Sequence, residues 1–387
     1  MKKIIKYIIL SIFGGVLFQS CNNIEDKYMY NSDSYTIDWN AAADSATTSL
    51  VSRFWNTTGH YFVYTPDNWS DTNPGYWPQA HAMDVIIDAY IRTKDTKYSQ
   101  MFDQWYDGIK TVNFSTHQDY WNAYYDDMSW ICLTMIRLYD VTKTDKYLNT
   151  AKELWGYIKS GWDETYANGG ISWEYYDHKW SKNACTNGPA SIIGSRMYAI
   201  TKDESDKEWA SKIYEWEKAT LYNPATGAVY DNINGQTNEL SKTTLSYNQG
   251  TFLGAAYELY KITGDITYLN DARKAAYYAI SNSSMIDTGN NVLRDEGDGD
   301  GGLFKGIFMR YFVQLMLENN LDIVYKNKFE TFFNNNAETL WRKGVLKQDI
   351  LFGTSWTTPA VGTTQLTSHI SGCTLIEAKA YYQNNKK

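Results

Sequence analysis

The sequence predicts an all-α fold, an (α/α)6 barrel in which six helical hairpins close into a ring. One short phrase recurs four times along the chain, at intervals of 49 to 62 residues. Between the copies, apolar residues recur at three- and four-residue steps, as they do on one face of an α-helix. Strand signals are sparse, and short apolar runs near residues 170–175 and 227–233 predict at most small hairpins in loops.

The recurring phrase marks the turn between two helices. Three copies span residues 92–98, 141–147 and 262–268, and a longer version spans 200–209. Each copy follows an aromatic-rich helical pattern and precedes another. A Thr or Asp ahead of the aromatic residue can cap the second helix by accepting a free backbone N–H. Repeats of this period are typical of helical arrays and toroids.

The helical periodicity predicts about twelve helices. The fourth of them is typical, because Trp121, Tyr124, Met128, Cys132 and Met135 recur at helical steps. An open superhelix is the alternative to a closed ring. Long loops rich in Trp, Gly and Asn favour the ring with a site on one face. The expected helices begin near residues 39, 77, 96, 121, 145, 188, 205, 247, 266, 302, 322 and 366.

The first twenty residues read as a secretion signal rather than as part of the fold. Three early lysines precede a short apolar stretch from Ile8 to Phe18, which is too short for a stable membrane span. Ser20 and Cys21 then give a small residue followed by cysteine, as expected for a bacterial lipoprotein lipidated on Cys21. A plain cleaved signal peptide with an incidental cysteine is the alternative.

The sequence predicts that the remaining chain forms one domain. A polar tether over residues 21–37 leads into a domain from 38 to 387, since no Ser/Gly-rich or single-charge tract divides the rest. Loss of three leader lysines takes the net charge from −8 to −11, which argues against nucleic-acid partners and leaves neutral polymers. We expect a monomer whose only contact with a membrane is the lipid on Cys21. Three cysteines without regular spacing predict apolar packing, namely Cys132, Cys185 and Cys373.

The sequence contains no clear motif for a metal site or for an activated nucleophile. The five histidines form no pair at metal-ligand helical spacing, and the chain has no phosphate-binding loop or nucleophile-elbow serine. The acidic segment 295–302 resembles a calcium loop but lacks the alternating ligand register. We expect a Gly-rich acidic loop at the barrel mouth there, and no metal or cofactor. Aromatic clusters in loops, such as 61–64 and 173–176, predict a binding groove.

Asp126 and Asp127 form the sharpest chemical feature. They lie early in a predicted amphipathic helix, inside an aromatic stretch. Two neighbouring carboxylates are costly to desolvate together, and sharing one proton drives their pKa values apart. Glycoside hydrolysis needs that combination of an ionised carboxylate and a protonated one. The alternative is a pair that is solvated or that caps the helix. For an Asp-Asp pair without such surroundings, this alternative would be the better interpretation.

The surroundings of the pair resemble glycoside hydrolase family 76, the α-1,6-mannanases. Several motifs occur in register over nearly the whole mature chain, and one departure from the family is Ser181, where an aromatic residue is usual before Lys-Asn. The matching segments are Tyr125–Trp130, Gly169–Trp173, Lys182–Ala190, Val229–Asp231, Tyr247–Ala256 and Phe304–Tyr311.

The resemblance implies an (α/α)6 barrel, a retaining mechanism and endo-cleavage of α-1,6-linked mannose backbones without a cofactor. By that match Asp126 is the nucleophile and Asp127 the acid/base. Tryptophans Trp130 and Trp173 are expected to shape the cleft. The other residues expected to line it are Asn187, Asp231, Tyr247 and Asn248, with loop-fixing hydrogen bonds as the alternative role.

The expected function is therefore hydrolysis of α-mannan or manno-oligosaccharides by a protein lipid-anchored in the outer membrane, facing the periplasm or the cell surface. Two alternatives stay open. One is a transglycosidase acting at the same site, as the resemblance implies for fungal members of the family. The other is a surface lipoprotein that binds glycan without cutting it, against which the intact Asp pair argues.

Overall fold

The computed structural model describes residues 35–113 and 119–386. Residues Trp39–Lys387 form one compact unit. The predicted leader over 1–20, the lipidation site Cys21 and most of the tether lie outside the described residues. Within the part that is described, no helix is both long enough and apolar enough to cross a membrane.

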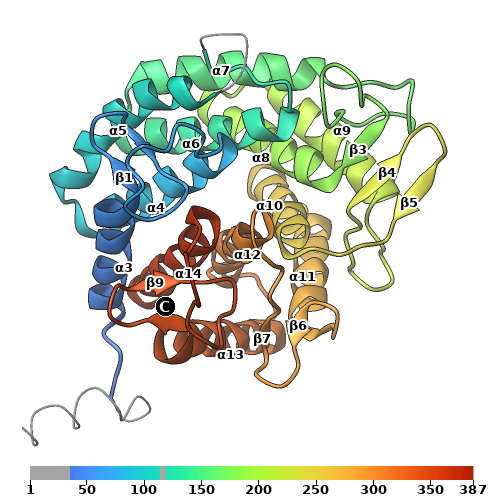
Figure 1. Cartoon of the computed structure of the whole chain (residues 1–387). Coiled ribbons are helices and arrows are strands. Elements are labelled where there is room, and N and C mark those ends of the chain that lie inside the picture. Colours follow the sequence, from blue (N-terminus) through green and yellow to red (C-terminus); the bar gives the residue numbers. More distant parts are fainter. Residues whose placement is uncertain (1–34, 114–118, 387) are drawn as a thin grey trace, which may run out of the picture. The chain divides into compact units, whose positions relative to one another are not determined.

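Twelve α-helices in the described ranges build a closed double ring, which confirms the predicted (α/α)6 barrel (Figure 1). Each inner helix contacts the next one, and the last inner helix returns to the first. The inner ring consists of α4 (Trp77–Thr93), α6 (Tyr125–Thr142), α8 (Ala184–Thr201), α10 (Ser246–Thr263), α12 (Gly301–Met316) and α14 (Leu366–Asn385). The outer ring consists of α3 (Trp39–Phe54), α5 (Thr96–Gly108), α7 (Asp145–Ser160), α9 (Glu204–Thr220), α11 (Ile266–Ser281) and α13 (Ile323–Thr339).

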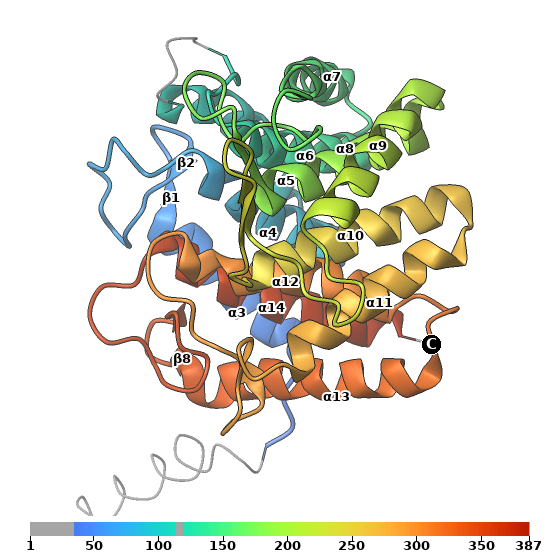
Figure 2. The same ribbon diagram turned by 90° about the vertical axis from the view of Figure 1, so that its right-hand side faces the viewer.

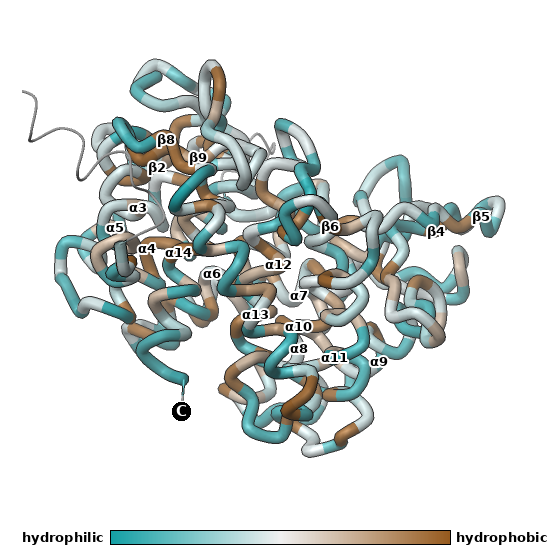
Figure 3. The backbone as a smooth tube through the Cα atoms, turned by 90° about the horizontal axis from the view of Figure 1, so that it is seen from below, coloured by the Kyte–Doolittle hydropathy of each residue, from teal (hydrophilic) through white to brown (hydrophobic). Residues whose placement is uncertain are grey.

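Burial distinguishes the two rings. Inner helix α12 buries 13 of its 16 residues, whereas outer helix α13 buries 6 of its 17. A helix that is apolar all round belongs in a core, and one with a single apolar face belongs at the surface. Figure 3 shows α12 as a largely apolar segment, while polar segments gather at loops and helix ends. Gly250 lets α10 and α12 approach, because a Cβ there would lie 2.6 Å from the Phe308 Cα.

The recurring phrase folds as a tight turn between an inner and an outer helix. In the first copy, the Thr93 hydroxyl donates to the Ala89 carbonyl and accepts from the Asp95 N–H. Lys94 takes the left-handed conformation, with φ of 57°, and Asp95 then caps α5 by accepting from the Lys97 N–H at 3.0 Å. The copies that begin α9 and α11 repeat the cap with Asp203 and Asp265.

Helix starts agree with the periodicity except at two sites. Helix α6 begins at Tyr125 rather than near residue 121, because the Asn122 side chain accepts from the Tyr124 N–H and Tyr124 bridges to Glu174. This tertiary pairing holds the preceding residues extended. Helix α8 begins at Ala184 rather than near residue 188, so that its proline lies inside the helix instead of at its start.

The long connections carry the short strands and lie at one end of the unit, to the left in Figure 2. In the predicted hairpin regions, Ile171, Glu174 and Val229 make single bridges, and the only strand is β4 (Asn232–Asn234). In the three-stranded sheet, β4 pairs with β3 (Ser181–Asn183) and with β5 (Glu239–Ser241), which places Lys182 opposite Ile233. The strands are β1 (Trp55–Asn56), β2 (Tyr61–Phe62), β3 (Ser181–Asn183), β4 (Asn232–Asn234), β5 (Glu239–Ser241), β6 (Ile286–Asp287), β7 (Val292–Leu293), β8 (Val345–Leu346) and β9 (Leu351–Phe352), with single turns η1 (Ile109–Val112) and η2 (Leu340–Gly344).

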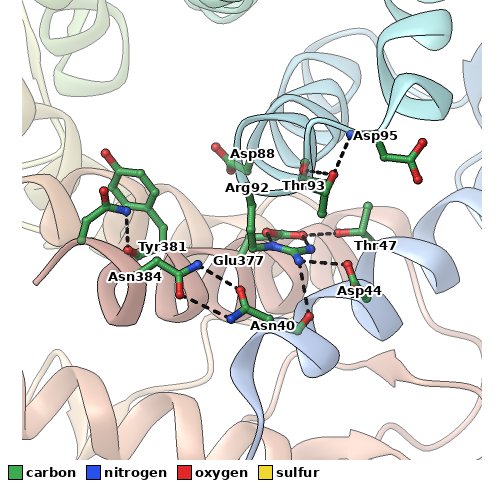
Figure 4. Close-up of polar contacts among 12 residues, drawn as sticks. Asn40, Asp44, Thr47, Asp88, Arg92, Thr93, Asp95, Glu377, Tyr381 and Asn384 are labelled. Carbon is green, nitrogen blue, oxygen red and sulfur yellow. Dashed lines mark hydrogen bonds and ion pairs between the residues drawn. The ribbon is translucent and has the colours of Figure 1, made fainter.

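A buried ion pair joins the first and last helices of the ring (Figure 4). Arg92 of α4 donates from Nε and Nη2 to the two carboxylate oxygens of Glu377 on α14, at 2.9 and 3.0 Å. Thr47 of α3 donates to the same carboxylate at 2.6 Å, and Asp44 of α3 pairs with Arg92 at 2.9 Å. One charged cluster therefore connects the three helices at which the ring closes.

Candidate active site

The inner helices all begin at the end of the unit that carries the long loops. The first five inner helices each lead through a short turn into the next outer helix, and a long loop then leads to the start of the next inner helix. The N-termini of the inner helices therefore gather around one opening. A cavity of about 330 Å³ lies there. It is lined by residues at the beginnings of five inner helices and from two loops, namely Trp77, Tyr124, Asp126, Asp127, Trp130, Trp173, Asn183, Cys185, Asp231, Tyr247, Asp300 and Phe304.

Asp126 and Asp127 occupy the first turn of α6, at the floor of this opening. The Tyr125 N–H donates to the Trp173 carbonyl at 3.1 Å, and the Tyr175 N–H donates to the Ala123 carbonyl at 2.9 Å. These bonds fix the start of the helix against the 173–175 loop. Because the turn is the last part of α6 before the cavity, two sequence neighbours can both face the same space despite pointing about 100° apart.

The two carboxyl groups differ in their surroundings. The Asp126 carboxylate accepts from the Asp127 N–H at 3.1 Å and from the Cys185 thiol at 3.5 Å. Burial raises the Asp126 pKa to about 6, while these donors oppose the rise. The Asp127 pKa is raised well above its ordinary value by burial and by the negative charges of Asp126 and Asp300. Near neutral pH, therefore, Asp126 is ionised first and Asp127 keeps the proton.

Aromatic side chains form two walls of the cavity. The Tyr247 and Phe304 rings stack with centroids 3.8 Å apart and planes within 4° of parallel. On the other side, the Tyr124 and Trp173 rings lie 5.0 Å apart. The apolar ring faces and polar edges of such residues suit a ligand that is itself apolar on its faces and polar at its rim.

The structure brings together four of the six predicted binding residues, because Trp130, Trp173, Asp231 and Tyr247 all line the cavity. Their contacts with substrate stay predictions.

The other two predicted binding residues, Asn187 and Asn248, are fully buried behind the cavity wall. Asn187 accepts from the Ile171 N–H at 2.8 Å and donates back to the Ile171 carbonyl at 3.1 Å, fixing the loop that carries Trp173. Asn248 donates to the Asp231 carboxylate at 2.9 Å and so orients it. Both asparagines therefore have the loop-fixing geometry that the sequence left open as their alternative role.

Sequence reasoning did not single out several lining residues. Cys185, expected to be ordinary packing, contacts the Asp126 carboxylate. Asp300 accepts from the Trp77 indole N–H at 3.1 Å and belongs to the acidic Gly-rich segment placed at the barrel mouth. Because that segment was predicted to lie at the barrel mouth, its position in the sequence could have identified Asp300 as a lining residue. Trp77, Tyr124, Asn183 and Phe304 complete the set.

In the acidic segment 295–302, the carboxylates of Asp295, Glu296 and Asp300 accept hydrogen bonds from other groups of the chain. Asp295 accepts from the Gly297 N–H and from the Thr354 hydroxyl, both at 2.8 Å. Glu296 accepts from the Ser246 N–H at 2.9 Å, which ties the segment to the start of α10. These bonds hold the N-terminus of α12, and with it Asp300, beside the cavity.

A larger cavity, of about 740 Å³, lies at the opposite end of the barrel. It is lined by the C-terminal ends of the inner helices, and its arginines pair with carboxylates, as Arg196 does with Glu258 at 2.9 Å and Arg310 with Asp88 at 2.8 Å. The smaller cavity is the candidate active site, because burial raises the pKa of Asp126, and burial together with negative charge raises the pKa of Asp127 further, as acid/base chemistry requires.

Solved structures share this architecture. The α-1,6-mannanase of Salegentibacter sp. HEL1_6 superposes with a TM-score of 0.84 at 38% identity, covering 89% of this chain and 100% of that chain. Inactive variants of it, in which two consecutive aspartates are replaced, were solved with α-1,6-mannotetrose and α-1,6-mannotriose. The Lin0763 protein of Listeria innocua superposes with a TM-score of 0.80 at 30% identity, covering 90% of this chain and 98% of that one.

Curated relatives match over shorter stretches. The mannan endo-1,6-α-mannosidase DCW1 of Candida glabrata is 28% identical over 167 residues, which is 39% of this chain. A putative mannan endo-1,6-α-mannosidase of Schizosaccharomyces pombe is 22% identical over 216 residues, half of this chain. The chain spans only 36% and 47% of the lengths of these two relatives.

The family model of glycosyl hydrolase family 76 matches residues 38–387. This range contains the closed ring of helices, the aspartate pair and every other residue that lines the cavity. The predicted resemblance is confirmed: the chain belongs to glycosyl hydrolase family 76.

Proposed function

We propose that the protein is a retaining endo-α-1,6-mannanase. The observation that carries the proposal is the buried pair Asp126 and Asp127 in the cavity lining, where burial raises the Asp126 pKa to about 6 and burial with nearby negative charge raises the Asp127 pKa further. Support for the substrate comes from the Salegentibacter enzyme, named an α-1,6-mannanase and solved with α-1,6-linked manno-oligosaccharides. The cavity is walled by aromatic rings and opens at the loop face, as a site for a neutral sugar chain requires.

The proposed reaction runs in two displacements. An Asp126 oxygen attacks the anomeric carbon while the bond to the leaving oxygen breaks, and Asp127 gives its proton to that oxygen. The shorter mannan chain departs and a glycosyl-enzyme ester remains. Asp127, now ionised, takes a proton from water as the water attacks the same carbon. The ester breaks, Asp126 returns as carboxylate, and one water is consumed for each bond cleaved.

Digestion of a linear α-1,6-mannan tests the proposal, with products followed by chromatography and by NMR in the first minutes. We expect shorter oligosaccharides whose new reducing ends appear first as the α-anomer, because two displacements restore the configuration. Products longer than the substrate would identify a transglycosidase. An unchanged polymer would indicate a protein that binds mannan without cutting it. First appearance of the β-anomer would contradict the double displacement and the role of Asp126.

The pH dependence of kcat/KM should be bell-shaped. Activity should rise with pH through an apparent pKa of about 6, because Asp126 must lose its proton to attack. It should fall at higher pH, where Asp127 loses the proton it donates. The apparent values belong to the pair rather than to either residue. An acid limb near about 4, the value of an exposed aspartate, would contradict the buried nucleophile.

We also propose that Cys21 carries a lipid that anchors the protein in the outer membrane. The support is the charged and apolar leader followed by Ser20-Cys21. In the native host, wild-type protein should sediment with membranes and be released by detergent, whereas Cys21→Ala should yield soluble protein or an unprocessed precursor. Wild-type protein found wholly in the soluble fraction would rule out the anchor.

A further inference from the structure

A thiol contacts the carboxylate to which the proposed function gives the nucleophilic role. Cys185 lies in the first turn of α8, and its sulfur is 3.5 Å from the Asp126 Oδ2. The other Asp126 oxygen accepts from the Asp127 N–H. The Cys185 side chain is 5% exposed and lines the cavity. The contact joins α6 and α8 at the point where the reaction would take place.

The thiol is held in its protonated form. Burial, together with the negative charges of Asp126 and Asp231, raises the Cys185 pKa well above its ordinary value. Tyr247 lines the same cavity as Cys185, and burial raises the Tyr247 pKa well above its ordinary value, so that both groups keep their protons. The S–H of Cys185 therefore remains available to donate to the Asp126 carboxylate.

We propose that Cys185 is a positioning residue that orients the Asp126 carboxylate and stabilises its ionised form through the S–H···O contact. This inference rests on the proposed function of the same site. A hydrogen bond to the ionised form of a carboxylate favours that form. A thiol is a weak donor, so it orients the oxygen while withdrawing little of the electron density that attack requires. A stronger donor would favour ionisation more and nucleophilicity less.

Other groups around Asp126 also influence its ionisation. Asp127 lies beside it on α6, and Tyr124 precedes them. From other elements, Asp231 and Tyr247 line the cavity beside Cys185, and Trp173 lines it beside Asp126. Asp300 of the α12 N-terminus acts on Asp127. No cationic side chain belongs to this set, so removing the thiol leaves the buried Asp126 carboxylate with one donor fewer.

Substitution at Cys185 tests the inference through the pH profile. In Cys185→Ala, the acid limb of kcat/KM should move up by about half a pH unit, because the ionised form loses a donor. Cys185→Ser restores a donor and should return the limb to the wild-type position or below it, with a lower plateau rate. Cys132→Ala removes an equally buried thiol that donates to the Ala151 carbonyl at 3.3 Å, and its limb should not move.

A second measurement needs no substrate, so it separates failure of this inference from failure of the proposed function. The infrared S–H stretching band assigned to Cys185 by its loss in Cys185→Ser should shift to lower frequency as Asp126 ionises. In Asp126→Asn it should not respond to pH over that range. An acid limb that coincides in Cys185→Ala and wild type, or an S–H band that ignores the titration, would overturn the positioning role.

Discussion

Asp126→Asn should lower mannanase activity by about five orders of magnitude, since removal of a nucleophile abolishes the covalent route. Asp127→Asn should lower it by about 10² to 10⁴-fold on mannan, which is the usual contribution of a general acid. With an activated aryl α-mannoside whose leaving group needs no proton, Asp127→Asn should form the glycosyl-enzyme at near wild-type rate and then stall. Initial-rate and burst kinetics on both substrates measure the difference.

A control for this experiment lies on the same helix. Asp140 is near the C-terminal end of α6, half-exposed and paired with Lys143 at 3.4 Å. Asp140→Asn should keep wild-type activity. Both variants should unfold at or above the wild-type temperature, because burial raises the pKa of each carboxyl above its value in the unfolded chain, and such a group lowers the stability of the folded state at every pH above that unfolded value. Near-normal activity in folded Asp126→Asn and Asp127→Asn would exclude this pair as the catalytic site.

Breaking the buried ion pair at the ring closure should have the largest effect on stability. Glu377→Gln leaves the buried Arg92 guanidinium with only the solvent-exposed carboxylate of Asp44, and we expect a loss of about 3 kcal/mol in the free energy of unfolding. Arg92→Met should cost a similar amount by leaving Glu377 unpaired. The double variant Arg92→Met/Glu377→Leu should recover most of the loss, because neither charge remains buried. Urea unfolding of the four proteins measures each value.

An exposed pair provides the comparison. Lys110 and Asp107 lie 3.0 Å apart, with the Asp107 side chain 71% exposed. Asp107→Asn should change stability by less than about 0.5 kcal/mol, since solvent screens such a pair. If Glu377→Gln costs no more than Asp107→Asn, the cluster does not hold the ring closed.

The helical framework was predictable because its signals are local. Thr93, Lys94 and Asp95 make the inter-helix turn with bonds among themselves and their nearest neighbours, so the same phrase identifies the same turn elsewhere. The start of α6 was placed about four residues too early because Tyr124 is held extended by a bridge to Glu174. A contact across 50 residues leaves no trace in helical periodicity.

The candidate active site could be predicted only where its residues are neighbours in the sequence. Asp126 and Asp127 are adjacent, so the sequence alone suggests their joint role, and the structure places both in the lining of one cavity. The contact of Cys185 with Asp126 spans 59 residues and depends on how α6 packs against α8. Asn187 and Asn248 show the converse limit, because a polar residue in a matching motif can face the cavity or brace its wall. The sequence shows which residue type stands in a motif, but only the packing of the helices decides whether its side chain faces the cavity or is buried behind it.

The ring closure also constrains the order of folding. Thr47 and Glu377 are 330 residues apart in the chain, so the contact that completes the ring forms only after nearly all of it has been made. Contacts of such long range slow folding because chain entropy is lost before they form. Until α14 arrives, the apolar flanks of α4 and α12 lack their neighbour and are prone to aggregate. A chain cut before residue 366 should accordingly remain a chaperone client, however well its first hairpins form.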